Sequence, residues 1–367
     1  MCFPIFHAWL TLLFFRLCAV TLRSRPPLVY CASRTARTAS LLSAAPQLTQ
    51  RDETSLEKTN LVSSLSSSHV SDMSTKVAVV TGSNKGIGLS IVRALCKQYQ
   101  GDVYLTARDT GRGQEAVESL SSEGLKAMFH QLDINDLNSI TTAAAFFKDK
   151  YGGVDVLINN AGIAFKGGDD DIMSTLPPSL CLSLSSGADT TAFAIQAEVT
   201  LKTNFFATRD MLTHFLPIVK AGGRVVNVSS FVGARTLNQC SPDHQQRFRS
   251  EDITEEELVG MMQQFVDEAK RGEHKKGGWP DTAYGMSKTG LTTLSMIHAR
   301  QLSKERPNDG ILLNACCPGW VRTDMAGPKA PKSPDEGAIT PVYLALLPPG
   351  ATEPHGKFVS DKEVQPW

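Results

Sequence analysis

The sequence predicts an α/β fold in which helices cover both faces of a doubly wound parallel sheet. From Lys76 onward, short apolar segments alternate with longer segments whose apolar residues recur at helical spacing, as in residues 137–151. A glycine-rich turn at 81–88 joins the first apolar segment to the first helix. One α/β domain can exceed about 250 residues. The unbroken alternation therefore predicts a single domain over residues 73–367.

The predicted strands are short, apolar and bounded by turn residues, as buried parallel strands are. The helices are longer and carry apolar residues on one face. We expect strands at 77–81, 103–108, 127–134, 154–162 (the strand with its exit), 223–230, 311–317 and 357–360, with the last closing the sheet. We expect helices at 89–96, 137–151, 197–219 and 336–347, a charge-rich helical insertion at 242–277, and a helix that carries Tyr284.

The turn after the first strand has the composition of a phosphate-binding loop. Gly82, Gly86 and Gly88 lack the Cβ atoms that would block a tight turn and the close approach of a pyrophosphate to the helix N-terminus. Glycine triplets also occur in ordinary loops. The strand before this one and the helix after it indicate a dinucleotide site.

The end of the second strand indicates which dinucleotide binds. NAD-binding proteins place an acidic residue there for the ribose 2′-hydroxyl, whereas this chain has Arg108. Arg108 and Lys85 could flank a 2′-phosphate, which favours NADP(H). Asp109 comes next in the chain and leaves open that Arg108 is only a solvated charge. Asp133, at the end of the third strand, is placed to accept from an adenine amino group.

Tyr284 and Lys288 stand four residues apart and share one helical face. A free tyrosine has a pKa of about 10, and a neighbouring ammonium lowers that pKa because it favours the phenolate. The pair can therefore serve acid–base chemistry. Most Tyr-x-x-x-Lys pairs in proteins are only surface neighbours, so a catalytic interpretation of this pair depends on the motifs that precede it.

Four ordered motifs resemble those of the short-chain dehydrogenase/reductase family, which has a Rossmann-type fold. They are Thr81-Gly-x-x-x-Gly-Ile-Gly88, Asn159-Asn-Ala-Gly162, Ser230 and Tyr284-x-x-x-Lys288. The longer runs 253–260 and 316–328 look like those of its monomeric NADPH-dependent carbonyl reductases. The resemblance implies that Tyr284 donates a proton to the carbonyl oxygen and that Lys288 lowers its pKa and holds the nicotinamide ribose. It also implies that Ser230 orients the carbonyl and that Asn204 holds a water in a proton relay.

The same resemblance implies two sets of binding residues. The NADPH residues are Gly82, Asn84, Lys85, Gly86, Ile87, Gly88, Arg108, Asp133, Ile134, Asn160, Tyr284, Lys288, Pro318, Gly319, Val321 and Thr323. The substrate residues are Phe165, Lys166, Gln196, Ser230 and Trp320, the last of which would wall an apolar pocket or else be plain core.

The implied activity is reduction of quinones, ketones and aldehydes to alcohols, with steroids, prostaglandins and glutathione adducts as further candidates. Two alternatives stay open. One is a pterin or hydroxysteroid reductase on the same framework, and the other is a non-catalytic NADP-binding redox sensor. Retention of all four catalytic residues argues against the sensor, while an open apolar pocket leaves the substrate almost unspecified.

Charge and cysteine content limit the partners. The formal net charge is zero, so no overall field recruits nucleic acid or an anionic membrane. The eight cysteines form no C-x-x-C pair and no regular spacing, which argues against a zinc site or a disulfide framework. Adjacent Cys316 and Cys317 are most simply small core residues, although Cys317 borders the predicted site and could react.

Two stretches depart from the reductase pattern. Residues 1–72 are basic and Ser-rich. They are consistent with a mitochondrial transit peptide, with a signal segment or, as we favour, with sequence outside the working enzyme, which would be cytoplasmic. Residues 167–187 form a low-complexity insertion rich in Ser and Leu. We expect it to be a translated intron remnant rather than a surface loop, and sequencing of full-length transcripts tests this. The 242–277 insertion should block helix pairing and leave a monomer.

Overall fold

The computed structural model describes residues 75–165 and 192–367. The expectations for residues 1–72, for 167–187 and for Lys166 lie outside the described residues. In the described part, an eight-stranded sheet has the order β3-β2-β1-β4-β5-β6-β7-β8. All neighbours are parallel except β7 and β8. The predicted α/β fold is therefore confirmed.

The strands of the sheet begin and end near their predicted positions. Their bounds are β1 Val77–Val80, β2 Asp102–Ala107, β3 Met128–Gln131, β4 Val154–Asn159, β5 Val219–Val228, β6 Leu312–Cys317, β7 Phe358–Ser360 and β8 Glu363–Gln365. The expectation that 357–360 closes the sheet is wrong. The chain turns back at Asp361 and Lys362, both with positive φ, and β8 adds an antiparallel edge.

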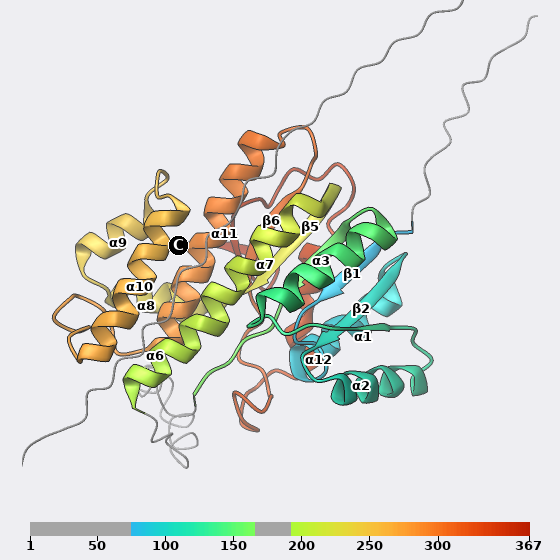
Figure 1. Cartoon of the computed structure of the whole chain (residues 1–367), viewed down its shortest axis with the longest axis horizontal. Coiled ribbons are helices and arrows are strands. Elements are labelled where there is room, and N and C mark those ends of the chain that lie inside the picture. Colours follow the sequence, from blue (N-terminus) through green and yellow to red (C-terminus); the bar gives the residue numbers. More distant parts are fainter. Residues whose placement is uncertain (1–74, 166–191) are drawn as a thin grey trace, which may run out of the picture. The chain divides into compact units, whose positions relative to one another are not determined.

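Helices pack on both faces of the sheet, and the side-chain alternation of β1 shows how. Val77 and Val79 belong to a core shared with α3 (Leu137–Tyr151), α7 (Ala207–Phe215) and α11 (Ala283–Glu305). Ala78 and Val80 face the opposite core, with α1 (Gly86–Gln98), α2 (Thr110–Ser122) and α12 (Pro334–Ala345). Figure 1 shows α3, α7 and α11 grouped apart from α1, α2 and α12. Both faces of β1 are fully buried, which explains its continuous apolar sequence.

Strand order reverses at β1, because β2 and β3 lie to one side and β4 and β5 to the other. In an open parallel sheet, a ligand binds beyond the carboxyl ends of the strands at such a switch point. The glycine turn after β1 and the Asn159-Asn160 pair at the end of β4 both lie there.

The expected helix over 197–219 is not uniform. The chain forms α6 (Phe193–Leu201), a π-helical turn at Lys202–Phe206, α7, and a short 3-10 turn at Leu216–Ile218 before β5 begins. π turns interrupt α-helices frequently at functional sites. Asn204 lies in the middle of this one, a distortion that apolar spacing does not signal.

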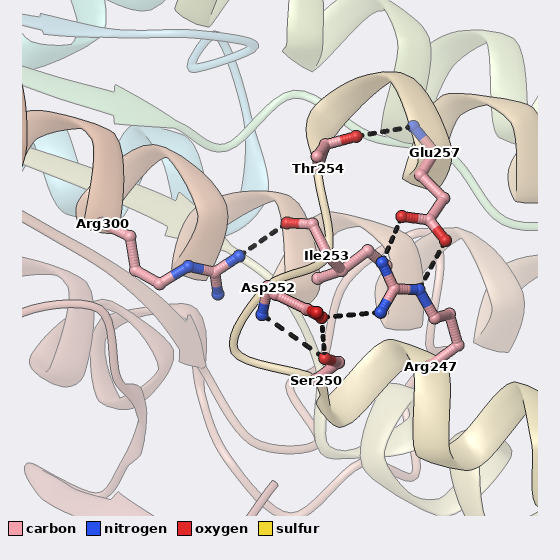
Figure 2. Close-up of polar contacts among 7 residues, drawn as sticks. All are labelled: Arg247, Ser250, Asp252, Ile253, Thr254, Glu257 and Arg300. Carbon is pink, nitrogen blue, oxygen red and sulfur yellow. Dashed lines mark hydrogen bonds and ion pairs between the residues drawn. The ribbon is translucent and has the colours of Figure 1, made fainter.

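The predicted helical insertion is confirmed as two helices, α9 (Pro242–Arg249) and α10 (Glu255–Arg271), and a further helix before it, α8 (Phe231–Gln239), was missed. Figure 2 shows how the turn between α9 and α10 is held. Arg247 binds both carboxylate oxygens of Glu257 and donates to Asp252 at 2.7 Å. Thr254 caps α10 by accepting from the Glu257 amide at 3.2 Å. Arg300 of α11 donates to the Ile253 carbonyl at 2.7 Å and so ties the turn to the sheet-covering helix.

Among the described residues, no helix is long and apolar enough to cross a membrane.

Candidate active site

The glycine turn has the shape that a pyrophosphate requires. Gly82 and Gly86 have φ of 59° and 57°, a region that favours glycine. A Cβ on Gly82 would lie 2.8 Å from Ala161, and one on Gly88 would lie 2.5 Å from Asn160 Nδ2 and 2.7 Å from the Gly82 carbonyl oxygen. Real side chains do not tolerate such contacts, so the turn leaves open backbone amides at the start of α1. These residues fit the phosphates of a dinucleotide.

Asn160 supports this turn from β4. Its Nδ2 donates to the carbonyls of Thr81 and Gly82, each at 3.0 Å, and the Thr81 hydroxyl accepts from the amides of Asn160 and Ala161, each at 3.0 Å. The sequence placed Asn160 among the cofactor residues. Its amide nitrogen is occupied by the loop, so the side chain shapes the site.

Two arginines, Arg108 and Arg112, lie beside Asp109 after β2, and Arg108 is exposed. Lys85 of the glycine turn is also exposed and forms an ion pair with Asp324, in the loop after β6, at 2.6 Å. Asp109 caps α2 by accepting from the Arg112 amide at 2.9 Å, and this bond is the main reason that the pKa of Asp109 lies below its ordinary value. Arg112 also approaches Asp109 with its guanidinium, at 3.5 Å. The prediction from sequence missed Arg112, which its position three residues after the helix cap could have signalled.

Asp133 and Ile134, the residues predicted to bind adenine, lie just beyond β3. Asp133 is half-buried beyond β3, and its Oδ1 accepts from the Asn135 amide at 3.0 Å. The Ser139 hydroxyl accepts from the Asp133 amide at 3.0 Å, while Ile134 is buried beside it. The carboxylate is thus fixed in orientation with its second oxygen available.

Tyr284 lies in the first turn of α11, where Thr282 caps the helix by accepting from the Gly285 amide at 3.0 Å. Lys288 is one turn later, and its Nζ lies 5.7 Å from the centre of the Tyr284 ring. The ammonium donates to the Val228 carbonyl at 2.8 Å. Burial lowers the pKa of Lys288 to about 8, a shift of the kind that is frequent at functional sites.

The end of β5 carries two serines with different surroundings. The Ser229 hydroxyl is occupied, because it donates to the Lys288 carbonyl at 3.1 Å and shares a 2.7 Å bond with Thr292. Ser230 caps α8 by accepting from the Val232 amide at 3.2 Å. Among the described residues its own proton has no acceptor. Ser230 is therefore the hydroxyl that can donate to a bound carbonyl.

Asn204 points from the π turn into the same region. Its Oδ1 accepts from the Ile163 amide at 2.8 Å, and its Nδ2 donates to the Ile163 carbonyl at 2.8 Å and to the Ser287 hydroxyl at 3.0 Å. A Cβ on Gly162 would lie 3.2 Å from Asn204 Oδ1 and 3.7 Å from Lys288 Nζ. Gly162 thus lets Asn204 and Lys288 approach the same point.

The loop after β6 lies alongside the glycine turn. A Cβ on Gly86 would meet Thr323 at 3.4 Å, and Val321 packs on Gly337 of α12. Gly319 has φ of 86°, and the Trp320 carbonyl accepts from the Lys332 amide at 3.1 Å. Trp320 and Phe165 are half-buried and Gln196 of α6 is buried. Pro318 begins this loop.

Cys316 and Cys317 are almost completely buried on β6. Burial raises the pKa of both thiols, which keeps them protonated and poorly nucleophilic. The interpretation of this pair as core residues agrees with the structure. No group of metal-ligating side chains occurs among the described residues.

The fold and this constellation define a dinucleotide-dependent oxidoreductase of the short-chain type. The short chain dehydrogenase family model matches residues 76–242. Carbonyl reductase [NADPH] 1 from Pongo abelii and that from Homo sapiens are each 62% identical to this chain over 291 residues, which is 79% of the chain and 98% of each relative. The chain belongs to the short-chain dehydrogenase/reductase family.

Solved structures agree with this assignment. Salutaridine reductase from Papaver somniferum is 29% identical with a TM-score of 0.67, covering 78% of this chain and 99% of that one. Menthone neomenthol reductase from Mentha piperita is 30% identical with a TM-score of 0.62, covering 79% of this chain and 99% of that one.

Proposed function

We propose that Tyr284 is the proton donor with which this chain reduces carbonyl compounds to alcohols. The chain is an NADPH-dependent oxidoreductase of the short-chain type, as its relatives named carbonyl reductase [NADPH] 1 and its matching family model support. NADPH supplies the hydride that reduces the carbonyl carbon. The side chains of the protein bind and orient the reactants and provide the proton.

The observation that carries the assignment is the buried Lys288 ammonium beside Tyr284. Its Nζ lies 5.7 Å from the centre of the phenol ring and is 2.8 Å from the Val228 carbonyl oxygen, its acceptor. A positive charge held in a dry site favours the phenolate that remains after Tyr284 gives up its proton. Lys288 keeps two further ammonium protons, which suit the hydroxyls of a nicotinamide ribose.

Ser230 and Tyr284 together receive the carbonyl oxygen. No described residue accepts the Ser230 proton, and the backbone position of Ser230 is fixed because the same hydroxyl caps α8. Donors that are already oriented stabilise the negative charge that develops on the oxygen without reorganising. Asn204, which lies near Lys288 across Gly162, would hold a water in the proton relay toward Lys288.

The cofactor residues divide by role. The glycine turn and the start of α1 receive the pyrophosphate, while Arg108 and Lys85, with Arg112 added, receive the 2′-phosphate. Asp133 and Ile134 would hold the adenine, and residues 318–323 would lie on the nicotinamide side. Phe165, Gln196 and Trp320 would border the substrate, and the family resemblance assigns Lys166 to the same set.

The direct test is Tyr284→Phe, which keeps the ring and removes the proton donor. We expect NADPH binding, measured by the quenching of protein fluorescence, to stay within about twofold of the parent. Positioned acid–base groups contribute on the order of 10²- to 10⁴-fold, so kcat with menadione should fall by at least a hundredfold. Tyr343→Phe, on α12, is the matched control and should keep full activity. Substantial turnover by folded Tyr284→Phe would refute the assignment.

We also propose that glutathione adducts are among the substrates and that the enzyme works as a cytoplasmic monomer. The apolar ring of Phe165 and the amide of Gln196, both assigned to the substrate by the family resemblance, suit a peptide-like adduct. Steady-state kinetics with a glutathione-conjugated ketone and with the same ketone unconjugated test the first point, since equal KM values would contradict it. Microscopy of the full-length chain carrying a fluorescent tag tests the location.

A further inference from the structure

Ser287 is a buried hydroxyl next to the proposed site, and the proposed catalytic and binding roles do not use it. It stands on α11 between Tyr284 and Lys288, and its side chain has no exposed surface. Its hydroxyl donates to the Tyr284 carbonyl at 2.7 Å and accepts from Asn204 Nδ2 at 3.0 Å. One hydroxyl thus joins the first turn of α11 to the π turn.

The Asn204 amide depends on this contact. Asn204 is 1% exposed, so water does not readily replace a lost partner. Its two amide hydrogens go to the Ile163 carbonyl and to Ser287, and its oxygen accepts from the Ile163 amide. Without the serine hydroxyl, one buried hydrogen would have no acceptor. The side chain, or the π turn that carries it, would then move to find one.

We propose that Ser287 is a positioning residue for the proton relay, because its hydroxyl fixes the position of the Asn204 side chain relative to Tyr284 and Lys288. This inference rests on the proposed roles of those three residues. π turns have looser hydrogen bonding than α-helical ones, so a tether from a rigid neighbouring helix fixes what the local backbone leaves adjustable. The contact spans 83 residues of sequence, and only the tertiary structure brings the two groups together.

The test compares Ser287→Ala with Ser287→Thr, which keeps a hydroxyl on the same carbon. We expect Ser287→Ala to lower kcat by on the order of tenfold, because displaced catalytic groups lose part of the contribution they make when positioned. The Kd for NADPH should stay within about twofold, since Ser287 lies away from the glycine turn. The apparent pKa in the pH profile of kcat should shift, and Ser287→Thr should restore most of kcat and the parent profile.

Ser295 on the same helix provides a matched control. It is also buried, and its hydroxyl donates to the Leu291 carbonyl at 2.7 Å and accepts from Asn227 Nδ2 at 2.8 Å. Ser295→Ala removes the same kind of bridge two turns further from Tyr284. We expect it to lower the melting temperature about as much as Ser287→Ala while leaving kcat and its pH profile unchanged.

A double-mutant cycle with Asn204→Ala assigns the effect to the contact. If Ser287 acts through Asn204, Ser287→Ala should cost little further activity in the Asn204→Ala background. Additive losses would overturn the proposal, as would parental kcat and pH profile in Ser287→Ala or an equal loss of kcat in Ser295→Ala. Those results would leave the assignment of Tyr284 intact, because that depends separately on Tyr284→Phe.

Discussion

Lys288 has to keep a positive charge in a place that disfavours charge. The side chain is 5% exposed, and burial lowers its pKa from 10.5 to about 8. The Val228 carbonyl offsets part of this desolvation. The proposed catalytic arrangement therefore lowers the stability of the fold, which is common where a functional group must be buried.

The first consequence concerns pH and stability. Below pH 8 the ammonium is charged in both the folded and the unfolded chain, and the full burial penalty applies. Between pH 8 and 10.5 the folded chain loses this proton while the unfolded chain keeps it, so Lys288 destabilises the fold progressively less as pH rises.

Replacing the ammonium should reveal this penalty. We expect Lys288→Met to raise the free energy of unfolding at pH 7 by up to about 3 kcal/mol, from 1.36 kcal/mol per pKa unit, and the gain to shrink between pH 8 and 10.5. Chemical denaturation of parent and variant at pH 7, 9 and 10.5 measures it, with exposed Lys148→Met as control. A less stable Lys288→Met at pH 7 would contradict the burial argument.

Arg108 decides the choice of cofactor in our assignment. We expect Arg108→Asp to raise KM for NADPH at least tenfold and to improve the use of NADH, because the 2′-phosphate loses a guanidinium and meets a like charge. Lys148→Asp, at an exposed position of α3, makes the same charge change away from the site and should leave the ratio of kcat/KM for the two cofactors unaltered. An unchanged ratio in Arg108→Asp would show that Lys85 and Arg112 suffice.

Among the secondary-structure elements, glycine has a different effect in the glycine turn than in α10. Gly88 lies where a Cβ would meet backbone atoms of Gly82 and Ser83 at 2.7 Å, whereas a Cβ on Gly260, at an exposed position of α10, would meet nothing within 4 Å. Packing therefore requires glycine at position 88. Gly260 only weakens its helix, because glycine costs about 1 kcal/mol relative to alanine in a helix interior.

Alanine at these two positions should therefore have opposite effects. Gly88→Ala should lower the melting temperature and raise the Kd for NADPH at least tenfold, since the turn must move to admit the methyl group. Gly260→Ala should raise the free energy of unfolding by roughly 0.5–1 kcal/mol and leave NADPH binding alone. Thermal unfolding and cofactor titration measure both, and tight NADPH binding by Gly88→Ala would show that the turn is more adaptable than its contacts indicate.

At the scale of the whole described domain, α10 packs against α11 and is joined to α7 by an ion pair. Arg209 of α7 binds Glu255 at the start of α10 at 2.5 Å, and His298 of α11 lies 3.4 Å from the same carboxylate. Leu258, Met262, Phe265 and Val266 of α10 join the core beneath. Part of the surface of α11 is thus covered by α10 within the chain.

We therefore predict a monomer in solution. Light scattering coupled to size-exclusion chromatography should give the mass of one chain across a hundredfold range of protein concentration, because the apolar surface for pairing is already buried. As a control on the cover itself, Glu255→Arg places like charges beside Arg209 and should destabilise the domain. A stable dimer of the parent would refute the prediction.

The order of the seven parallel strands and most of the helices, the glycine turn and the proposed catalytic pair could be predicted from the amino-acid sequence. These features are local: alternating burial appears as apolar spacing, and Tyr284 and Lys288 share a face because four residues make about one helical turn. The sequence analysis missed β8, α2 (Thr110–Ser122) and α8, and apolar spacing did not signal the π turn.

Which of the neighbouring polar groups are available for chemistry became clear only from the packed structure. The Ser229 hydroxyl is hydrogen-bonded to Thr292 and to the Lys288 carbonyl, whereas no described residue accepts the Ser230 proton. Asn160 braces a loop, and Asn204 is held by Ile163 and Ser287. The physical reason is that hydrogen bonds and burial join residues far apart in the chain, so each group's partners, and hence its proton, depend on how the elements pack.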